Sequence, residues 1–377
     1  MTASVMVLLW RTLGEPDLAT TSGTLTPDDM FSIVRISLAA VAGIGGIVAL
    51  VVAFRRQKFI ETDHLRAVAA EKREDTRLFT ERFRSAAEQM GSDKAAVRLA
   101  GLYALRELGD DWVSGRQMCA DVICAYLRMP FRGPFSMGSE GDEELAVEAG
   151  SESGAQEFQV RLTAQKLIAS RLPERGTSKG LPNSWDIALD LSGAHLINLD
   201  LSLKVILSMK CDRATFHGDT WFNGSVFLDD VGFYDTVFNG RAVFTGATFR
   251  RHGGFAGSKM LNGAYFVKAK FDIDAEFLRA GLGGEVEFRG ASVLHGRFDF
   301  HDAQFDGRLN FSRVDWGSNG AEKVFVGASA TQRTSASGLP DPWSLVGNAF
   351  VKESMGGDSA PHSGENDRLL APDAPSE

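Results

Sequence analysis

The chain has 377 residues, which leaves room for two or three domains, and its apolar content of 44% is typical of a folded protein. Its formal net charge is −9, but that charge is spread unevenly along the sequence. The only cysteines, Cys119, Cys124 and Cys211, are too few and too irregularly spaced for a disulfide framework, and they suit a reducing compartment. No second Cys or His pair follows Cys119 and Cys124 at ligand spacing, so we expect buried helix thiols rather than a zinc site.

The N-terminal segment, residues 1–30, is expected to lie outside the cytoplasm. Its apolar run, Val5 to Trp10, is too short to cross a membrane, and no small-residue cleavage motif follows, so a cleaved signal peptide is not expected. Pro27 suits the first position of a helix, and Asp28 and Asp29 suit its first turn, so a helix is predicted to begin there.

Residues 31–54 are predicted to form a transmembrane helix with the lipid bilayer as its partner. Ile36 to Phe54 are nineteen residues without a charge, close to the roughly 20 residues that a bilayer core requires. Basic residues follow the span at Arg55, Arg56 and Lys58, whereas Arg11 lies far upstream. The positive-inside rule therefore predicts a single-pass protein of the plasma membrane, with its N-terminus outside and the rest in the cytoplasm.

Small residues within the span leave a homodimer open. Ala39 and Gly43, like Ala42 and Gly46, have the spacing that lets two membrane helices approach closely. Such pairs are common in membrane helices, so the pattern alone does not decide the oligomeric state.

Residues 55–130 are predicted to form a helical, coiled coil-like stalk and a small helical unit. Phe79, Phe83, Ala87 and Met90 lie on one helical face, and charges of both signs occupy the other. Residues 131–157 are predicted to form a flexible acidic linker, because residues 139–157 hold seven acidic side chains and no basic one. We expect a capping helix and a loop in residues 158–184.

An eleven-residue repeat runs from Ala214 to Arg313. Each block starts with Ala, Ser or Thr and carries a large apolar residue at its third and ninth positions. Fifteen of these eighteen positions are Phe: Phe216, Phe222, Phe227, Phe233, Phe238, Phe244, Phe249, Phe255, Phe266, Phe271, Phe277, Phe288, Phe300, Phe305 and Phe311, the others being Met260, Leu282 and Val293.

The spacing of these residues, five and six in alternation, fits neither a helix nor a flat strand. It fits a chain that turns a corner every five or six residues and points one bulky side chain inward on each side, with Gly at turns that need positive φ. The repeat therefore predicts a β-solenoid filled with Phe. One block has an extra residue near Phe298 and Phe300, which we interpret as a bulge or corner adjustment, with a functional interruption left open.

The repeat resembles the bacterial pentapeptide-repeat family in its Phe-rich form, and strict fives from Leu191 to Phe216 match the commoner form. The resemblance implies a right-handed, four-sided β-helix, which we place at residues 185–316. Six coils about 4.8 Å apart would make a rod roughly 30 Å long. Residues 77–112 and 116–131 resemble the segment before the repeats in membrane-anchored members of this family. That match implies one span, a helical unit and then the β-helix, and it carries over no catalytic residue.

Residues 317–377 are rich in Gly, Ser, Ala, Asp and Pro, and most of them are predicted to be disordered. A short apolar patch from Trp343 to Val351 is a candidate cap for the last coil.

We find no residues that predict an enzyme. His217, His252, His295 and His301 stand at different block positions, so they are not expected to stack into a ligand set. No zinc-protease, phosphate-loop, serine-hydrolase or dinucleotide motif occurs. The sequence therefore predicts no catalytic, cofactor-binding or metal-binding residue.

Two functional hypotheses remain. The first is a membrane-tethered, non-enzymatic scaffold or protein-interaction module facing the cytoplasm, with a protein partner of unknown identity. The second is a DNA mimic that protects a type II topoisomerase, as some soluble pentapeptide-repeat proteins do. From Asp190 to Asp315 there are sixteen acidic and fourteen basic side chains, which predicts no acidic stripe for a mimic and no basic face for nucleic acid. The scaffold is therefore favoured, and direct nucleic-acid binding is not expected.

Overall fold

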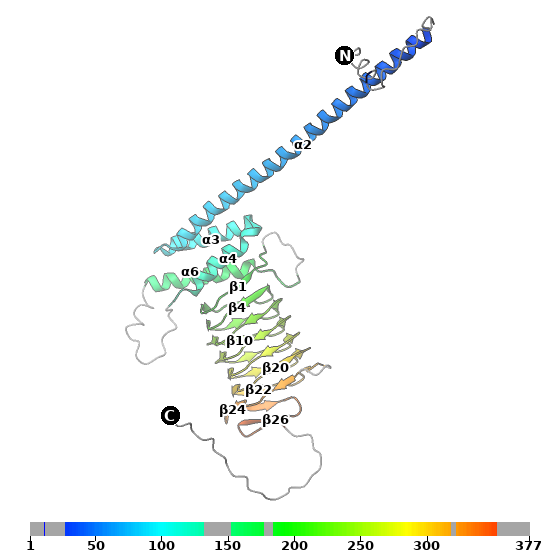
Figure 1. Ribbon diagram of the computed structural model, residues 1–377. Coiled ribbons are helices and arrows are strands. Elements are labelled where there is room, and N and C mark those ends of the chain that lie inside the picture. Colours follow the sequence, from blue (N-terminus) through cyan, green and yellow to red (C-terminus); the bar gives the residue numbers. More distant parts are fainter. Residues whose placement is uncertain (1–10, 12–26, 132–151, 177–183, 318–321, 353–377) are drawn as a thin grey trace, which may run out of the picture. The chain divides into compact units, whose positions relative to one another are not determined.

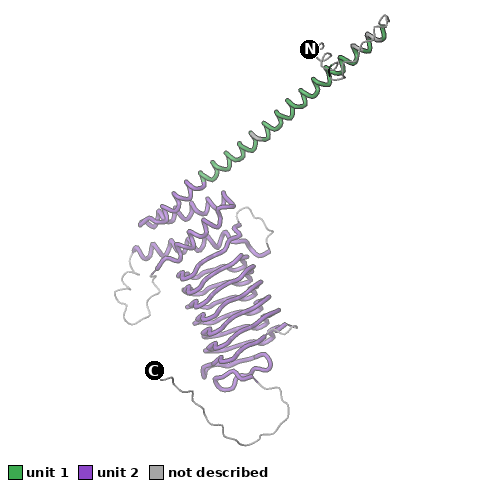
Figure 2. Tube along the Cα trace, viewed as in Figure 1, with its two compact units in different colours: residues 1–78 green, residues 79–377 purple. Residues whose placement is uncertain are grey.

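The computed structural model describes residues 11, 27–131, 152–176, 184–317 and 322–352 (Figure 1). The chain divides into two compact units, residues 1–78 and residues 79–377 (Figure 2). Most of the N-terminal segment expected at residues 1–30 lies outside the described residues. So do residues 353–377 and residues 132–151 of the expected linker.

The first unit consists mainly of the long helix α2, which spans Pro27–Met90 and continues into the second unit. Its start at Pro27 confirms the predicted helix start. From Val34 onward it contains a stretch long and apolar enough to cross a membrane, and none of that stretch is buried by other parts of the protein. Large apolar side chains such as Ile36, Leu50 and Phe54 are exposed along it.

The second unit begins with the last turns of α2, followed by α3 (Ala95–Asp111), η1 (Val113–Gly115), α4 (Arg116–Arg128) and α6 (Glu152–Arg171). Leu102, Leu105 and Leu108 of α3 are buried in the core that these helices share. Gly101 is required where α3 meets α2, because a Cβ there would lie 2.9 Å from the Ala86 carbonyl oxygen.

Helix α6 begins at Glu152, so the linker boundary predicted at residue 157 is wrong. Glu157 belongs to this helix, and its carboxylate is bound by α3, by α4 and by the next turn of α6. Its oxygens accept hydrogen bonds from Arg98 (3.0 Å), Tyr126 (2.6 Å) and Arg161 (2.7 Å). The Arg161 guanidinium also donates to the Leu127 and Met129 carbonyls, closing the end of α4. The acidic composition predicted that Glu157 is solvated, whereas in the structure its carboxylate connects α6 to α3 and α4.

After the helices the chain winds into a four-sided β-helix whose sides we call faces 1 to 4, in chain order. Face 1 comprises β1 (Ala188–Asp190), β4 (Ser208–Lys210), β8 (Val231–Gly232), β12 (Gly253–Gly254), β16 (Ala275–Glu276), β20 (Arg297–Asp299) and β23 (Glu322–Val324). Face 2 comprises β2 (His195–Ile197), β5 (Thr215–His217), β9 (Val237–Phe238), β13 (Lys259–Met260), β17 (Gly281–Gly283), β21 (Gln304–Asp306), β24 (Ser329–Ala330), β27 (Ala349–Lys352) and β26 (Trp343–Val346). Face 3 comprises β6 (Thr220–Trp221), β10 (Ala242–Val243), β14 (Ala264–Tyr265), β18 (Val286–Glu287), β22 (Arg308–Asn310) and β25 (Ser335–Ser337). Face 4 comprises β3 (Val205–Ile206), β7 (Val226–Phe227), β11 (Thr248–Phe249), β15 (Lys270–Phe271) and β19 (Ser292–Val293).

The strands of each face stack in parallel, in register with the coils above and below. Val226 pairs with Thr248, for example, and Thr248 pairs with Lys270, so each coil repeats after two eleven-residue blocks. This arrangement confirms the β-helix that the repeat predicted.

Phenylalanine rings fill the interior in stacked columns. Phe222, Phe244 and Phe266 stack along the axis at centroid separations of 4.9 Å, with ring planes within 8° of parallel. Across the interior, Phe244 meets Phe255 edge to face at 5.5 Å and 86°. Both arrangements are favoured for aromatic pairs, so each ring is stabilised along the axis and across it.

The extra residue near Phe298 lies in the corner before β20, which confirms a corner adjustment. Phe298 occupies an inward position held by Ala275 in the preceding coil, with which it pairs, and both Phe298 and Phe300 are fully buried. The column of Phe227, Phe249 and Phe271 ends in the smaller Val293, and the Phe298 ring lies 5.4 Å from that of Phe271. The second Phe therefore fills space that Val293 leaves.

The β-helix continues past Trp316, so the end predicted there is wrong, and residues 322–352 are folded. Strands β23, β24 and β25 extend faces 1, 2 and 3 by one more coil. The Phe pattern fades in this coil because Ala330 and Ala336 take inward positions that Phe305 and Leu309 hold in the coil before. The antiparallel hairpin β26–β27 then covers the last coil, as expected for this patch, and Phe350 stacks on Phe325 at 5.3 Å.

The opposite end of the β-helix is closed by two glutamine side chains that act like an added strand. The Gln165 amide, from α6, donates to the Ile197 carbonyl at 3.1 Å and accepts from the Ile197 N–H at 2.8 Å. Gln117, from α4, makes the same pair of contacts with Ala188, at 2.9 Å each. On face 4 the Pro173 carbonyl accepts from the Val205 N–H at 2.7 Å. Helices and loop thus satisfy backbone groups that an open sheet edge would leave unpaired.

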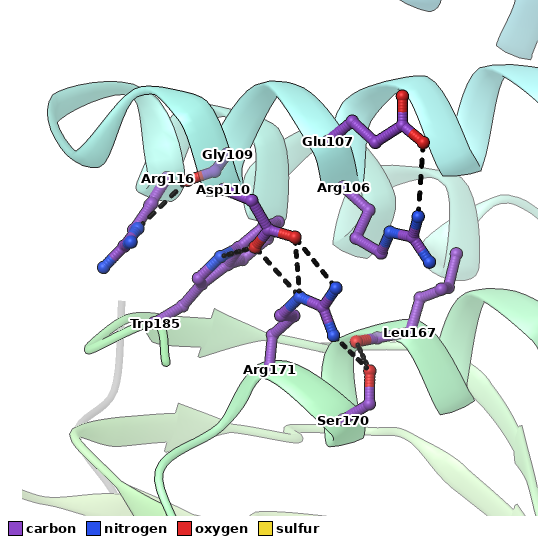
Figure 3. Close-up of polar contacts among 9 residues, drawn as sticks. All are labelled: Arg106, Glu107, Gly109, Asp110, Arg116, Leu167, Ser170, Arg171 and Trp185. Carbon is purple, nitrogen blue, oxygen red and sulfur yellow. Dashed lines mark hydrogen bonds and ion pairs between the residues drawn. The ribbon is translucent and has the colours of Figure 1, made fainter. Parts of the chain in front are cut away.

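Asp110 ties the helices to the start of the β-helix (Figure 3). Its carboxylate accepts from the Trp185 indole N–H at 3.0 Å and from two nitrogens of Arg171 at 2.9 and 2.8 Å. Trp185 is buried against Gly109, where a Cβ would lie 2.4 Å from the indole ring. Any larger residue at position 109 would displace the tryptophan.

We predict opposite effects for two serines that occupy the same kind of corner position. Ser258 is fully buried and its hydroxyl has no partner among the described residues, whereas Ser225 donates to the Leu201 carbonyl at 2.6 Å. Ser258→Ala should raise the free energy of unfolding by about 1 kcal/mol, and Ser225→Ala should lower it by about 1 kcal/mol. Thermal unfolding of the full chain in detergent would measure both, and a loss of stability in Ser258→Ala would contradict the argument.

We also predict that the glutamine cap matters most where water is excluded. Gln165→Met should destabilise the full chain by about 1–3 kcal/mol, because the buried Ile197 backbone groups lose their partners. Gln117→Met is the matched control, since its contacts with Ala188 lie at the surface, where water replaces them. Equal losses in the two variants would show that burial does not set the effect.

Candidate interaction surface

The described residues hold no group of three or more His, Cys, Asp or Glu side chains placed to bind a metal ion. The three cysteines are buried free thiols. Burial raises the pKa of Cys119 and that of Cys124 to about 12, and raises the pKa of Cys211 well above its usual value. These thiols therefore lack the thiolate character of a nucleophile.

Two histidines stack on face 2, and only one of them belongs to the four repeat histidines considered in the sequence. His195 of β2 and His217 of β5 have nearly parallel rings, and Nδ1 of His195 lies 3.0 Å from Nε2 of His217. The sequence analysis placed His217 but not His195, which precedes the first eleven-residue block. Burial lowers the pKa of both, that of His217 to about 4, so the pair is neutral at physiological pH.

A second polar cluster lies on face 1. Nε2 of His252 is 3.0 Å from the Tyr234 hydroxyl and 3.3 Å from Oε2 of Glu276. The Tyr234 ring lies over Gly254, where a Cβ would come within 2.4 Å of it. Burial, followed by the nearby carboxylates, raises the pKa of Tyr234, so it keeps its proton and serves as a hydrogen-bonding group.

Many outward acids are paired with arginines of the adjacent coil. Arg241 donates to Asp219 at 3.0 Å, and Arg250 donates to Asp272 at 2.8 Å. Arg308 pairs with Glu285, and Arg251 lies 3.1 Å from Asp229. The hydrogen bond from Arg241 holds the pKa of Asp219 below its usual range. Exposed pairs of this kind add little stability, but they neutralise the carboxylates involved.

Basic side chains collect at the corner between faces 3 and 4. Lys268, Arg289 and Arg313 are exposed there in three successive coils, and Lys270 is exposed on face 4 beside them. None of the four forms an ion pair with a described residue. The expectation of no basic surface is therefore wrong at this corner, because coiling with a 22-residue period gathers charges that average out along the sequence.

A family model for pentapeptide repeats, described as nine copies, matches residues 212–259. The matched residues lie within the stacked coils, and the same coil geometry and Phe columns continue beyond them. The β-helix is a pentapeptide-repeat domain. Neither a curated protein nor a solved structure matches the chain significantly.

A pentapeptide-repeat domain is a repeat scaffold or interaction module, so its outer faces are the functional candidates. The faces differ in chemistry. Face 2 carries the neutral histidine pair, and face 3 carries ion pairs between adjacent coils, such as Arg241 with Asp219. Face 4 carries the unpaired cations along one border. Neighbouring residues within these surfaces lie about one coil, 21 to 24 positions, apart in the sequence. Predicting from the sequence which of these residues become neighbours therefore requires the length of one coil.

We predict that acid weakens the stacked histidines. Unfolding returns His217 to its ordinary pKa of 6.5, so its stabilising effect is complete above that pH and is lost as pH falls toward about 4. Between pH 7.5 and 4.5 the chain should lose about 2 kcal/mol more than the His217→Asn variant, allowing for partial solvent screening. Thermal unfolding at the two pH values tests this, and equal losses in both proteins would contradict it.

Proposed function

We propose that the protein is a single-pass plasma-membrane protein whose pentapeptide-repeat domain is a non-enzymatic, protein-binding scaffold in the cytoplasm. The observation that carries the tether is the exposed apolar stretch of α2, from Ile36 to Phe54, followed at once by Arg55 and Arg56. A helix that is apolar all round suits lipid, and flanking bases favour the cytoplasmic side.

The closed ends of the β-helix support a scaffold role. Glutamines cover one end and the β26–β27 hairpin covers the other, so the long sides are the surfaces left for a partner. The absence of a metal cluster among the described residues and the protonated, buried thiols give no support to a catalytic role.

The alternative, a DNA mimic that protects a type II topoisomerase, draws less support from the surface charges. A mimic needs a run of uncompensated acids matching phosphate spacing. Asp219, Asp272 and Glu285 are each paired with an arginine of the adjacent coil. Relief of topoisomerase inhibition by the purified chain would favour the mimic over the scaffold.

We predict a defined topology in intact cells. A cysteine introduced at Ser22 should react with a membrane-impermeant maleimide, whereas one introduced at Gln304, exposed on face 2, should react only after permeabilisation. The three native thiols should not react with the maleimide because they are buried. The reverse pattern would refute the proposed orientation.

The tether itself has a separate test. Ile44→Asp combined with Ile47→Asp should release the chain to the soluble fraction, because each acid near the middle of a membrane helix costs about 2.5–3.5 kcal/mol. The control is Leu65→Asp, at an exposed α2 position outside the apolar stretch, which should leave the chain in the membrane. Membrane retention of the double variant would contradict a tether by this segment.

A further inference from the structure

Exposed cations line the corner between faces 3 and 4 and continue onto the adjoining border of face 4. The Lys268 N–H donates to the Arg289 carbonyl at 3.0 Å, and the Gly290 N–H donates to the Ser312 carbonyl next to Arg313. Lys268, Gly290 and Arg313 therefore share one column, at about 4.8 Å per step, and Arg289 lies one residue before Gly290 in the middle coil. Arg175 lies along the same corner in the preceding coils, where it donates to the Gly224 and Gly246 carbonyls.

Exposed leucines share this side of the rod. Leu207, Leu228 and Leu294 each directly follow a strand of face 4, and they are 41%, 44% and 42% exposed. Leu203, at the corner before β3, is 57% exposed. Between them, Arg250 and Asp272 neutralise each other, so the leucines are interrupted by a pair without net charge.

We call the set formed by Leu203, Leu207, Leu228, Lys268, Lys270, Arg289, Leu294 and Arg313 the face-4 surface. It contrasts with face 1, where Glu276 lies 3.3 Å from His252 and Asp299 lies 3.3 Å from Arg297. Unpaired cations therefore line one border of face 4 although the total charge of the rod is nearly zero. A charge count over the sequence cannot show this.

The exposed leucines and unpaired cations of this side, with Leu294 among the cations and the other leucines in earlier coils, match the chemistry of an anionic membrane surface. Lysine and arginine attract lipid phosphates at the interface, and leucine enters the boundary between headgroups and acyl chains. A nucleic acid would use the cations but offer nothing to the leucines, since its backbone is polar. A protein partner needs no such alignment of charge along one border.

We propose that the face-4 surface binds the anionic lipid surface of the membrane in which α2 is anchored. The inference rests on the proposed function, because the tether supplies the membrane at high effective concentration. Weak, reversible contacts then suffice to hold the β-helix on its side, since the tether has already removed most of the cost of association. The content of anionic lipid would then decide whether face 4 is held against the bilayer, with faces 1 to 3 left accessible to partners.

The test uses the full chain in nanodiscs, with an environment-sensitive dye on a cysteine introduced at Ser292 of face 4. The dye should shift to the blue and gain at least twofold in intensity when phosphatidylglycerol is added to phosphatidylcholine. High salt should reverse the change, since it screens exposed charges. The same dye at Gln304, on face 2, should not respond.

Charge variants assign the effect to these cations. Lys268→Gln, Arg289→Gln and Arg313→Gln together should abolish the response at Ser292. The matched control replaces Arg213, Lys259 and Arg279, which are exposed on face 2 or at its border with face 1 and form no ion pair with a described residue. That control should respond like the unaltered chain.

Several outcomes would overturn the proposal. An equal response at Gln304, no response at Ser292, or a full response in the Lys268, Arg289 and Arg313 variant would each do so. A shift produced in phosphatidylcholine discs by inorganic phosphate or by single-stranded DNA would assign the corner to a soluble anion instead. A chain that enters discs without any dye response leaves the tether intact and refutes only this inference, whereas failure to enter discs refutes the tether.

Discussion

The stacking distance of phenylalanine rings is the constraint on which the rest of the structure depends. Successive rings along a column lie 4.5–5.1 Å apart, for example Phe216 on Phe238 and Phe233 on Phe255. That is close to the spacing of about 4.8 Å at which parallel strands hydrogen-bond. Aromatic contact and backbone pairing are therefore satisfied by the same coil rise. Because each side admits one large ring per coil, the chain must turn after five or six residues, and the outward side chains fall into columns.

Those columns explain which features could be predicted from the sequence. The spacing of the Phe residues predicted the β-helix, and Pro27 predicted the start of α2, because both signals are local. The final coil was missed since Ala330 and Ala336 replace large residues there. Glu157 looked like a linker residue because its partners, Arg98 and Tyr126, come from other helices. The stacked histidines and the basic corner depend on neighbours one coil, 21 to 24 residues, apart, which a local pattern does not reveal.

The two ends of the β-helix use different chemistry for one purpose. The side-chain amides of Gln165 and Gln117 have the donor and acceptor of a peptide group, so each pairs with the backbone of one edge residue in place of a further strand. At the other end a hairpin turns antiparallel and places Phe350 on the last ring. Asp110 links three chain segments through Arg171 and Trp185. The helices and the β-helix of the second unit thus share a continuous core, and the sides of the coil remain open to partners.

The 22-residue coil also bears on how such a rod can change during evolution. Duplicating or deleting one coil between Ser225 and Ala291 would alter its length by about 4.8 Å while each face keeps its columns in line. Neither the glutamine cap nor the terminal hairpin would need to adapt, because both contact only the coils next to them. Length is therefore a trait that unequal recombination can adjust in fixed steps, independently of the membrane segment and of the chemistry displayed on each side.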